Sequence, residues 1–170
     1  MITCPPGFKV QEFVPPDVYA LLGDEAIKLM DSRALSVIAQ MRVDYGPLIV
    51  NDWHNGGMYK YRGYRPLNCT EGATASRHRK GEGIDCKPVR TTVDAMRSDI
   101  IKKARAGHDV YAMIGAIEVP GAMFMIITTP ASIDRQEVFR RKGRLDQRMG
   151  AVDPGVEQAD SRRVVAWPGH

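Results

Sequence analysis

The chain has few cysteines and no long apolar run. Its three cysteines, Cys4, Cys69 and Cys86, are an odd number and lack the C-x-x-C spacing of a zinc ribbon. This count argues against a disulfide framework and predicts reduced, structural thiols. No stretch approaches the roughly 18 consecutive apolar residues of a membrane-spanning helix, so no membrane partner is expected.

A signal sequence and a nucleic-acid-binding pattern are also missing. Pro5, Pro6 and Gly7 interrupt the first residues, which do not form a charged and then apolar leader. We therefore expect the protein to be made in a cytoplasm, and to leave the cell, if at all, by lysis or inside a particle. The net charge of +4 permits an anionic partner without requiring one. Basic and aromatic residues do not interleave as they do in single-strand binders, so no specific nucleic-acid partner is expected.

The length and pattern of the chain predict one α+β domain with additions at both ends. With 170 residues, 44% of them hydrophobic, the chain can bury a substantial core. Helices that bracket a few antiparallel strands predict a small antiparallel sheet flanked by helices. We expect an extended N-terminal arm over 1–16, a domain over 17–130 and a C-terminal extension over 131–170. Periodicity and turn signals predict helices over 17–22, 24–30, 32–45, 92–106 and 133–149, and strands over 48–50, 83–87, 110–119 and 122–129.

Two helices and one strand have the clearest signals. Asp31 is a predicted N-cap for residues 32–45, and Leu35, Ile38, Met41 and Tyr45 recur at helical spacing on one face. Thr91 or Thr92 caps the later helix, whose expected buried face is Val93, Met96, Ile100 and Ala104. The apolar run 48–50 predicts a central strand, and 164–168 predicts a docking peptide.

The segment from Ser76 to Asp85, SRHRKGEGID, is the most informative part of the chain. It separates His78 from Asp85 by seven positions with glycines between them. Zinc accepts an imidazole nitrogen and a carboxylate oxygen, and glycines let a backbone approach an ion closely. His78 and Asp85 are therefore candidate metal ligands. A catalytic zinc ion would need a third protein ligand and a water molecule.

These residues carry a family resemblance. SRHRKGEGID resembles the S-x-H-x-x-G-x-[AG]-x-D signature of M15-type zinc peptidases, which include D-alanyl-D-alanine carboxypeptidases and L-alanyl-D-glutamate endopeptidases. The upstream run NDWHNGG…YRGYR resembles the phage-encoded branch of that family. The resemblance covers about 8–130 and implies the Hedgehog/DD-peptidase fold.

The family's site roles transfer to particular positions of this sequence. The resemblance implies that His78 and Asp85 are the first two zinc ligands and that Ser76 supports the loop by hydrogen bonding. It implies that Arg65 grips a substrate oxygen, a task suited to a guanidinium fork, and that Glu118 is the acidic catalytic position. Loop-shaping positions correspond to Trp53, Gly56 and Gly57.

The chain departs from the family at the third ligand. The alignment puts Met125 where the ligating His belongs and Ile127 where an Asp belongs. A thioether is a soft, weak donor that does not suit zinc. His108 is the best substitute among the other histidines. Without a metal, we expect His78 and Asp85 to contact each other as an imidazole–carboxylate pair.

Three functional hypotheses follow. The first is a degenerate peptidase without a cofactor, which serves as a structural or binding component of a bacteriophage virion in its tail or head–tail region, with other virion proteins and further copies of itself as partners. The second is an active zinc peptidase that cleaves peptidoglycan stem peptides. The third is a non-catalytic peptidoglycan-binding module that uses Arg65 and the aromatic loop around Trp53, Tyr59, Tyr61 and Tyr64.

Overall fold

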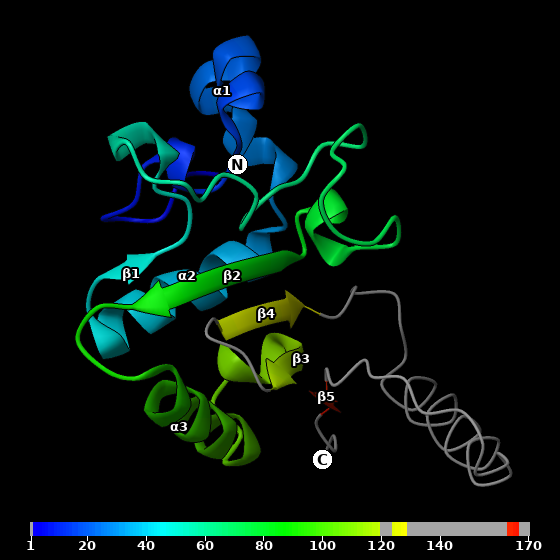
Figure 1. The fold of residues 1–170 in the computed structure, drawn as a ribbon. Helices are drawn as coiled ribbons and strands as arrows, with labels where there is room; N and C mark the ends of the chain where they lie inside the picture. Colours follow the sequence, from blue (N-terminus) through cyan, green and yellow to red (C-terminus); the bar gives the residue numbers. More distant parts are fainter. Residues whose placement is uncertain (1, 120–123, 129–162, 167–170) are drawn as a thin grey trace, which may run out of the picture.

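The structure, a computed structural model, describes residues 2–119, 124–128 and 163–166 (Figure 1). Its longer helices are α1 (Pro16–Leu22), α2 (Ser32–Tyr45) and α3 (Val93–Arg105). The strands are β1 (Leu48–Ile49), β2 (Gly83–Pro88), β3 (Ile114–Val119), β4 (Phe124–Thr128) and β5 (Arg163–Ala166). Short 3-10 helices are η1 (Val10–Glu12), η2 (Gly23–Leu29), η3 (Trp53–Asn55), η4 (Arg77–Lys80) and η5 (Tyr111–Met113). The predicted mixed α+β class is confirmed.

The described strands form one antiparallel sheet in the order β1-β2-β4-β3-β5. This order places β1 at an edge, so the prediction of a central strand at 48–50 is wrong. β4 is the central strand, and β2 lies between β1 and β4. The predicted hairpin over 110–129 is present as the β3–β4 pair, although its first residues form η5. The predicted docking peptide overlaps β5, which pairs with β3, and the predicted helix 133–149 lies outside the described residues.

The two capped helices lie where their sequence signals predict them. The Asp31 side chain accepts hydrogen bonds from the first backbone amides of α2, and Thr92 caps α3 through Ala95 N–H at 3.1 Å. Ile38 and Met41 of α2 and Met96 and Ile100 of α3 are completely buried. Figure 1 shows α2 lying behind β2, where it covers one face of the sheet. The helical periodicity therefore identified the faces that build the core.

The N-terminal segment predicted as an arm contributes to this core. Phe13 and Val14 are completely buried, and Phe8 and Val10 are nearly so. Phe13 and Val14 also accept hydrogen bonds from the loop that follows β1. Residues 8–14 thus pack as part of the domain, in contact with the loop that follows β1. Within the described residues, no helix combines the length and the apolar character that crossing a membrane requires.

A polar cluster fastens α2 to α3. Lys103 donates to Asp44 at 2.8 Å and to Asp99 at 2.9 Å, while Tyr111 donates to Asp44 at 2.9 Å and Tyr45 to Asp99 at 2.8 Å. Partial burial acts to raise the pKa of Asp44, but the bonds from Lys103 and Tyr111 hold this pKa below its ordinary value. The hydrogen bond from Lys103 likewise lowers the pKa of Asp99. Burial, followed by the bond to Asp99, raises the pKa of Tyr45 to about 12.

This cluster predicts an acid-sensitive fold. Because the pKa of Asp44 is lower in the folded state, its contribution is present above the unfolded pKa of about 3.9 and is lost as the pH falls through the folded value. We expect Asp44→Asn to cost about 1–3 kcal/mol at pH 7 and to flatten the fall in unfolding free energy between pH 5 and pH 3. Urea unfolding at each pH measures both effects. Glu25→Gln, which alters only an exposed pair with Lys28, is the control and should change neither.

Candidate active site

The backbone of residues 62–65 positions both candidate metal ligands. The carbonyl of Arg62 accepts a hydrogen bond from the Asp85 amide at 2.7 Å, and the carbonyl of Gly63 lies 2.8 Å from His78 Nδ1. Two further bonds hold the segment itself: Tyr64 N–H donates to Phe13 O at 2.7 Å, and Arg65 N–H donates to His78 O at 3.1 Å. Residues 62–65 therefore connect the buried N-terminal segment to η4 and β2.

The sequence brings His78 and Asp85 together as predicted. His78 lies in η4 and Asp85 in β2, and Gly81, with φ 68°, makes the turn between these elements. His78 Nε2 lies 3.5 Å from Asp85 Oδ2, and the two residues are 2% and 7% exposed. The expected imidazole–carboxylate contact is therefore present, and it is nearly closed to solvent.

The tautomer of His78 follows from its neighbour. A carbonyl oxygen only accepts hydrogen bonds, so His78 Nδ1 carries the proton that it shares with Gly63. In a neutral ring, Nε2 then presents a lone pair, and this buried atom has no hydrogen-bond partner. A lone pair that faces a carboxylate oxygen is the arrangement that a cation would stabilise. The His78–Asp85 pair is therefore suited to form part of a metal site.

Arg65 lies against the same carboxylate. Its Nη2 is 3.4 Å from Asp85 Oδ2, and its Nε donates to Tyr61 O at 2.6 Å. The side chain is 16% exposed. The residue expected to grip a substrate oxygen thus has its guanidinium directed toward Asp85.

The strand register places Met125 and Glu118 in the same row as Asp85. Met125 is the direct backbone partner of Asp85 across the β2–β4 pair. In the β3–β4 pair Ile117 is opposite Ile126, so the register brings Glu118 beside Met125. With neighbouring strands about 4.8 Å apart, β3 lies about 10 Å from β2. The position aligned with the missing His is therefore next to Asp85.

A complete zinc site does not form among the described residues. In the ranges given above, no three His, Cys, Asp or Glu side chains gather closely enough to hold a metal ion. His108, the proposed substitute, instead stacks on Tyr111 with ring centroids 4.7 Å apart. Cys86 follows Asp85 but is completely buried, and this burial raises the pKa of its thiol, so it stays protonated. Two ligands and a thioether position do not fit the donor set of a catalytic zinc ion.

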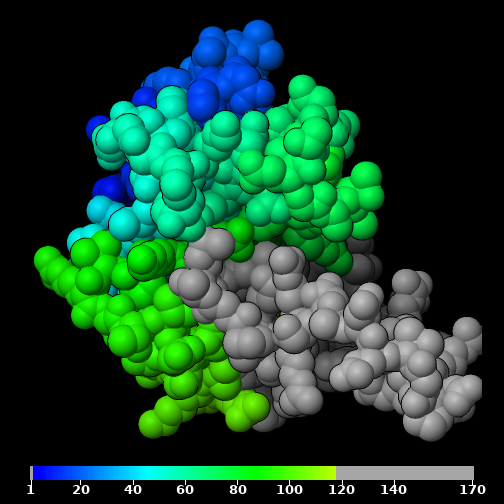
Figure 2. All heavy atoms as spheres, viewed as in Figure 1, coloured from blue at the N-terminus to red at the C-terminus, as the bar shows by residue number. Residues whose placement is uncertain are grey.

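The remaining predicted positions shape the loop. Trp53 Nε1 donates to Val14 O at 2.9 Å, Gly56 adopts φ 83°, and a Cβ on Gly57 would lie 2.1 Å from the Asp52 carboxyl carbon. The backbone of Ser76 donates a hydrogen bond to Ala73 O at 3.0 Å and accepts one from Arg79 N–H at 3.1 Å. These residues are structural in their observed contacts. Figure 2 shows the segment 50–80 as a continuous surface layer above α3.

Asn51 and Gly63 are the site residues that sequence reasoning missed. Asn51 Oδ1 accepts from Arg62 N–H at 2.9 Å, while its Nδ2 donates to Val14 O at 3.3 Å. A Cβ on Gly63 would lie 2.2 Å from Phe13 O. Asn51 opens the Asn-x-Trp run and Gly63 lies inside Arg-Gly-Tyr-Arg, so the motifs contained both residues, but their contacts are long-range.

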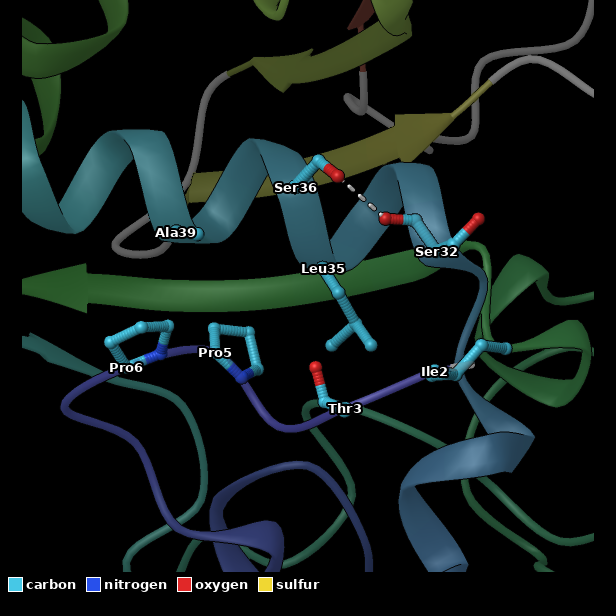
Figure 3. A pocket seen from close by; sticks show the side chains of 8 residues that line it. All are labelled: Ile2, Thr3, Pro5, Pro6, Ser32, Leu35, Ser36 and Ala39. Carbon is cyan, nitrogen blue, oxygen red and sulfur yellow. Dashed lines mark hydrogen bonds between the residues drawn. The ribbon is translucent and has the colours of Figure 1, made fainter.

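A shallow groove lies away from this pair. Figure 3 shows it between the N-terminal segment and α2, with Pro5, Pro6 and Leu35 among its walls and Ser36 Oγ bonded to Ser32 O at 2.9 Å. None of its lining residues is titratable, so it offers no acid, base or metal ligand.

Comparisons with protein-family models, curated proteins and solved structures gave no match.

The packing of Gly63 gives a test of the site's construction. We expect Gly63→Ala to destabilise the fold by about 3 kcal/mol or more, because its methyl group would collide with the backbone of Phe13, which cannot move independently. Gly56→Ala is the control: it meets open space and incurs only left-handed backbone strain of about 1–2 kcal/mol. Urea unfolding compares the two. Equal stability of the variants would show that the Phe13–Gly63 contact is not tight.

Proposed function

We propose that this chain is a non-catalytic relative of the M15-type zinc peptidases that serves as a structural or binding component of a bacteriophage virion. The observation that carries the proposal is the pairing of Met125 with Asp85. A methionine at that position leaves the His78–Asp85 pair without the nitrogen ligand that zinc would need. The Hedgehog/DD-peptidase fold and the phage origin rest on the two sequence motifs.

The contacts around the pair also oppose catalysis. Glu118 would need a metal-bound water to deprotonate, and His78 and Asp85 supply too few ligands to hold the metal. Arg65 contacts Asp85, whereas an oxyanion-stabilising group must be directed at substrate. Within the part of the chain that the structure describes, His78 and Asp85 therefore have no third ligand beside them, and Arg65 is directed at Asp85.

The aromatic loop favours a structural role over a carbohydrate or peptide groove. Tyr59 lies under the Arg62 guanidinium with 3.0 Å between them, Trp53 is bonded to Val14, and its ring packs near Tyr19. These rings are engaged with the protein's own side chains. We therefore propose other virion proteins and further copies of this chain as partners, with peptidoglycan binding as the alternative that a pull-down on purified cell wall would reveal.

One observation favours an active zinc peptidase as the second candidate. His78 donates through Nδ1 to Gly63 O, which leaves Nε2 available as a ligand. A third ligand supplied by a neighbouring copy of the chain would complete a site with His78 and Asp85. Arg65 would then have to leave Asp85 in order to meet substrate.

Elemental analysis and a wall-hydrolysis assay on the full chain separate these candidates. The non-catalytic proposal expects less than stoichiometric zinc after purification without chelator, and no release of stem-peptide fragments. About one zinc per chain, with hydrolysis abolished by His78→Ala, would establish the enzyme instead. Mass spectrometry of purified particles tests the virion assignment separately, since a structural component must be present in them.

Restoring the third ligand should restore metal binding. We expect Met125→His to bind cobalt(II) at least about tenfold more tightly than the natural chain, because it adds a nitrogen opposite Asp85. Visible absorption of cobalt(II) measures the binding. Ile127→His, which pairs with Gly83, and Met125→His/His78→Ala are the controls and should not bind. Equal binding by Met125→His and Ile127→His would contradict the alignment.

A further inference from the structure

The buried carboxylate of Asp85 requires a positive charge nearby. Asp85 is 7% exposed, and taking a carboxylate out of water is costly unless a cation or hydrogen bonds compensate it. His78 does not supply a hydrogen bond in its neutral form, because its ring proton is shared with Gly63 on the opposite side. Among the described residues, the permanent cation that contacts Asp85 is the guanidinium of Arg65, whose Nη2 lies 3.4 Å from Asp85 Oδ2.

The guanidinium is also held in place by its own loop. Arg65 Nε is fixed on Tyr61 O at 2.6 Å, and a Cβ on Gly72 would lie only 2.5 Å from Arg65 Nη1. The chain at Gly72 therefore passes directly over the guanidinium, and any larger residue would displace it. Asp85 belongs to β2 of the central sheet, so the Arg65–Asp85 contact joins this loop to the core.

A second arginine secures the same loop without a carboxylate. Arg79 donates to Leu67 O and, at 2.7 Å, to Cys69 O. The Arg65 amide meanwhile donates to the carbonyl of His78 in η4. Arg79 thus makes hydrogen bonds within the loop 65–80, whereas Arg65 connects this loop to Asp85 in the sheet.

We propose that Arg65 is the internal counter-ion of Asp85, that it holds the place beside this carboxylate that a metal cation would take, and that the pair latches the loop 65–80 onto β2. The inference rests on the contacts of Arg65 and not on the proposed function. Arg65 is a positioning residue in this arrangement: it keeps His78 and Asp85 together and keeps the loop closed.

A double-mutant cycle in the presence of chelator tests the charge pairing. We expect Arg65→Met to raise the unfolding equilibrium constant at least tenfold, which is about 1.4 kcal/mol, because Asp85 is left uncompensated. Adding Asp85→Asn should recover most of that loss, since a neutral amide needs no cation. If Arg65→Met does not fold, folding of Arg65→Met/Asp85→Asn supports the pairing. Additive effects, or failure of both variants to fold, would overturn it.

Hydrogen exchange tests the latch, with Arg79→Met as the matched control. Arg65→Met/Asp85→Asn leaves no unpaired buried charge, but it also removes the contact between the loop 65–80 and β2. The backbone amides of 65–80 should therefore exchange faster than in the natural chain, while those of α2 keep their protection. Arg79→Met should loosen 66–69 without changing the dependence of stability on Asp85. Unchanged exchange of 65–80 in Arg65→Met/Asp85→Asn would refute the latch.

A cobalt titration tests whether Arg65 occupies the place of a cation. Cobalt(II) should raise the unfolding temperature of Arg65→Met more than that of the natural chain, and His78→Ala in the Arg65→Met background should abolish the difference. An equal rise in the natural chain and in Arg65→Met would overturn this part of the inference. The double-mutant cycle is measured in chelator, so its result does not depend on whether the natural chain binds zinc. Stoichiometric zinc in the natural chain would contradict the proposed function, whereas additive effects in the cycle would contradict the charge pairing.

Discussion

Two backbone carbonyls organise the candidate site. Those of Arg62 and Gly63 receive the Asp85 amide and the His78 ring proton, so adjacent residues of one loop set the position of both side chains. The loop can do this because Gly63 has no side chain and lies directly against the backbone of Phe13. The buried lone pair of His78 Nε2 follows from the same arrangement, because the ring proton lies on Nδ1 beside Gly63 O.

The core supplies the rigidity that this arrangement needs. Ile84 and Cys86 flank Asp85 in β2 and are completely buried, as are Ile38 and Met41 in α2. The N-terminal segment closes the other side through Phe13 and Val14. A polar pair held between buried residues on both sides cannot separate to find water, so its charge must be balanced within the protein.

The site brings a buried imidazole and a carboxylate together, without a third metal ligand among the described residues. His78 is oriented for ligation, yet Met125 occupies the neighbouring position on β4, and Arg65 brings a positive charge to the carboxylate. An arginine beside this buried carboxylate fits the proposal that the pair stabilises the fold.

The sequence by itself determined the local elements: Asp31 and the periodicity of Leu35, Ile38 and Met41 defined α2, and the glycines of the motif brought His78 toward Asp85. It did not determine that β1 lies at an edge, that residues 8–14 enter the core, or that Met125 pairs with Asp85 across β2 and β4. Caps and periodicity act within a few residues of one another. Strand order, the Gly63–Phe13 approach and the Arg65–Asp85 contact join distant residues, and only tertiary packing could decide them.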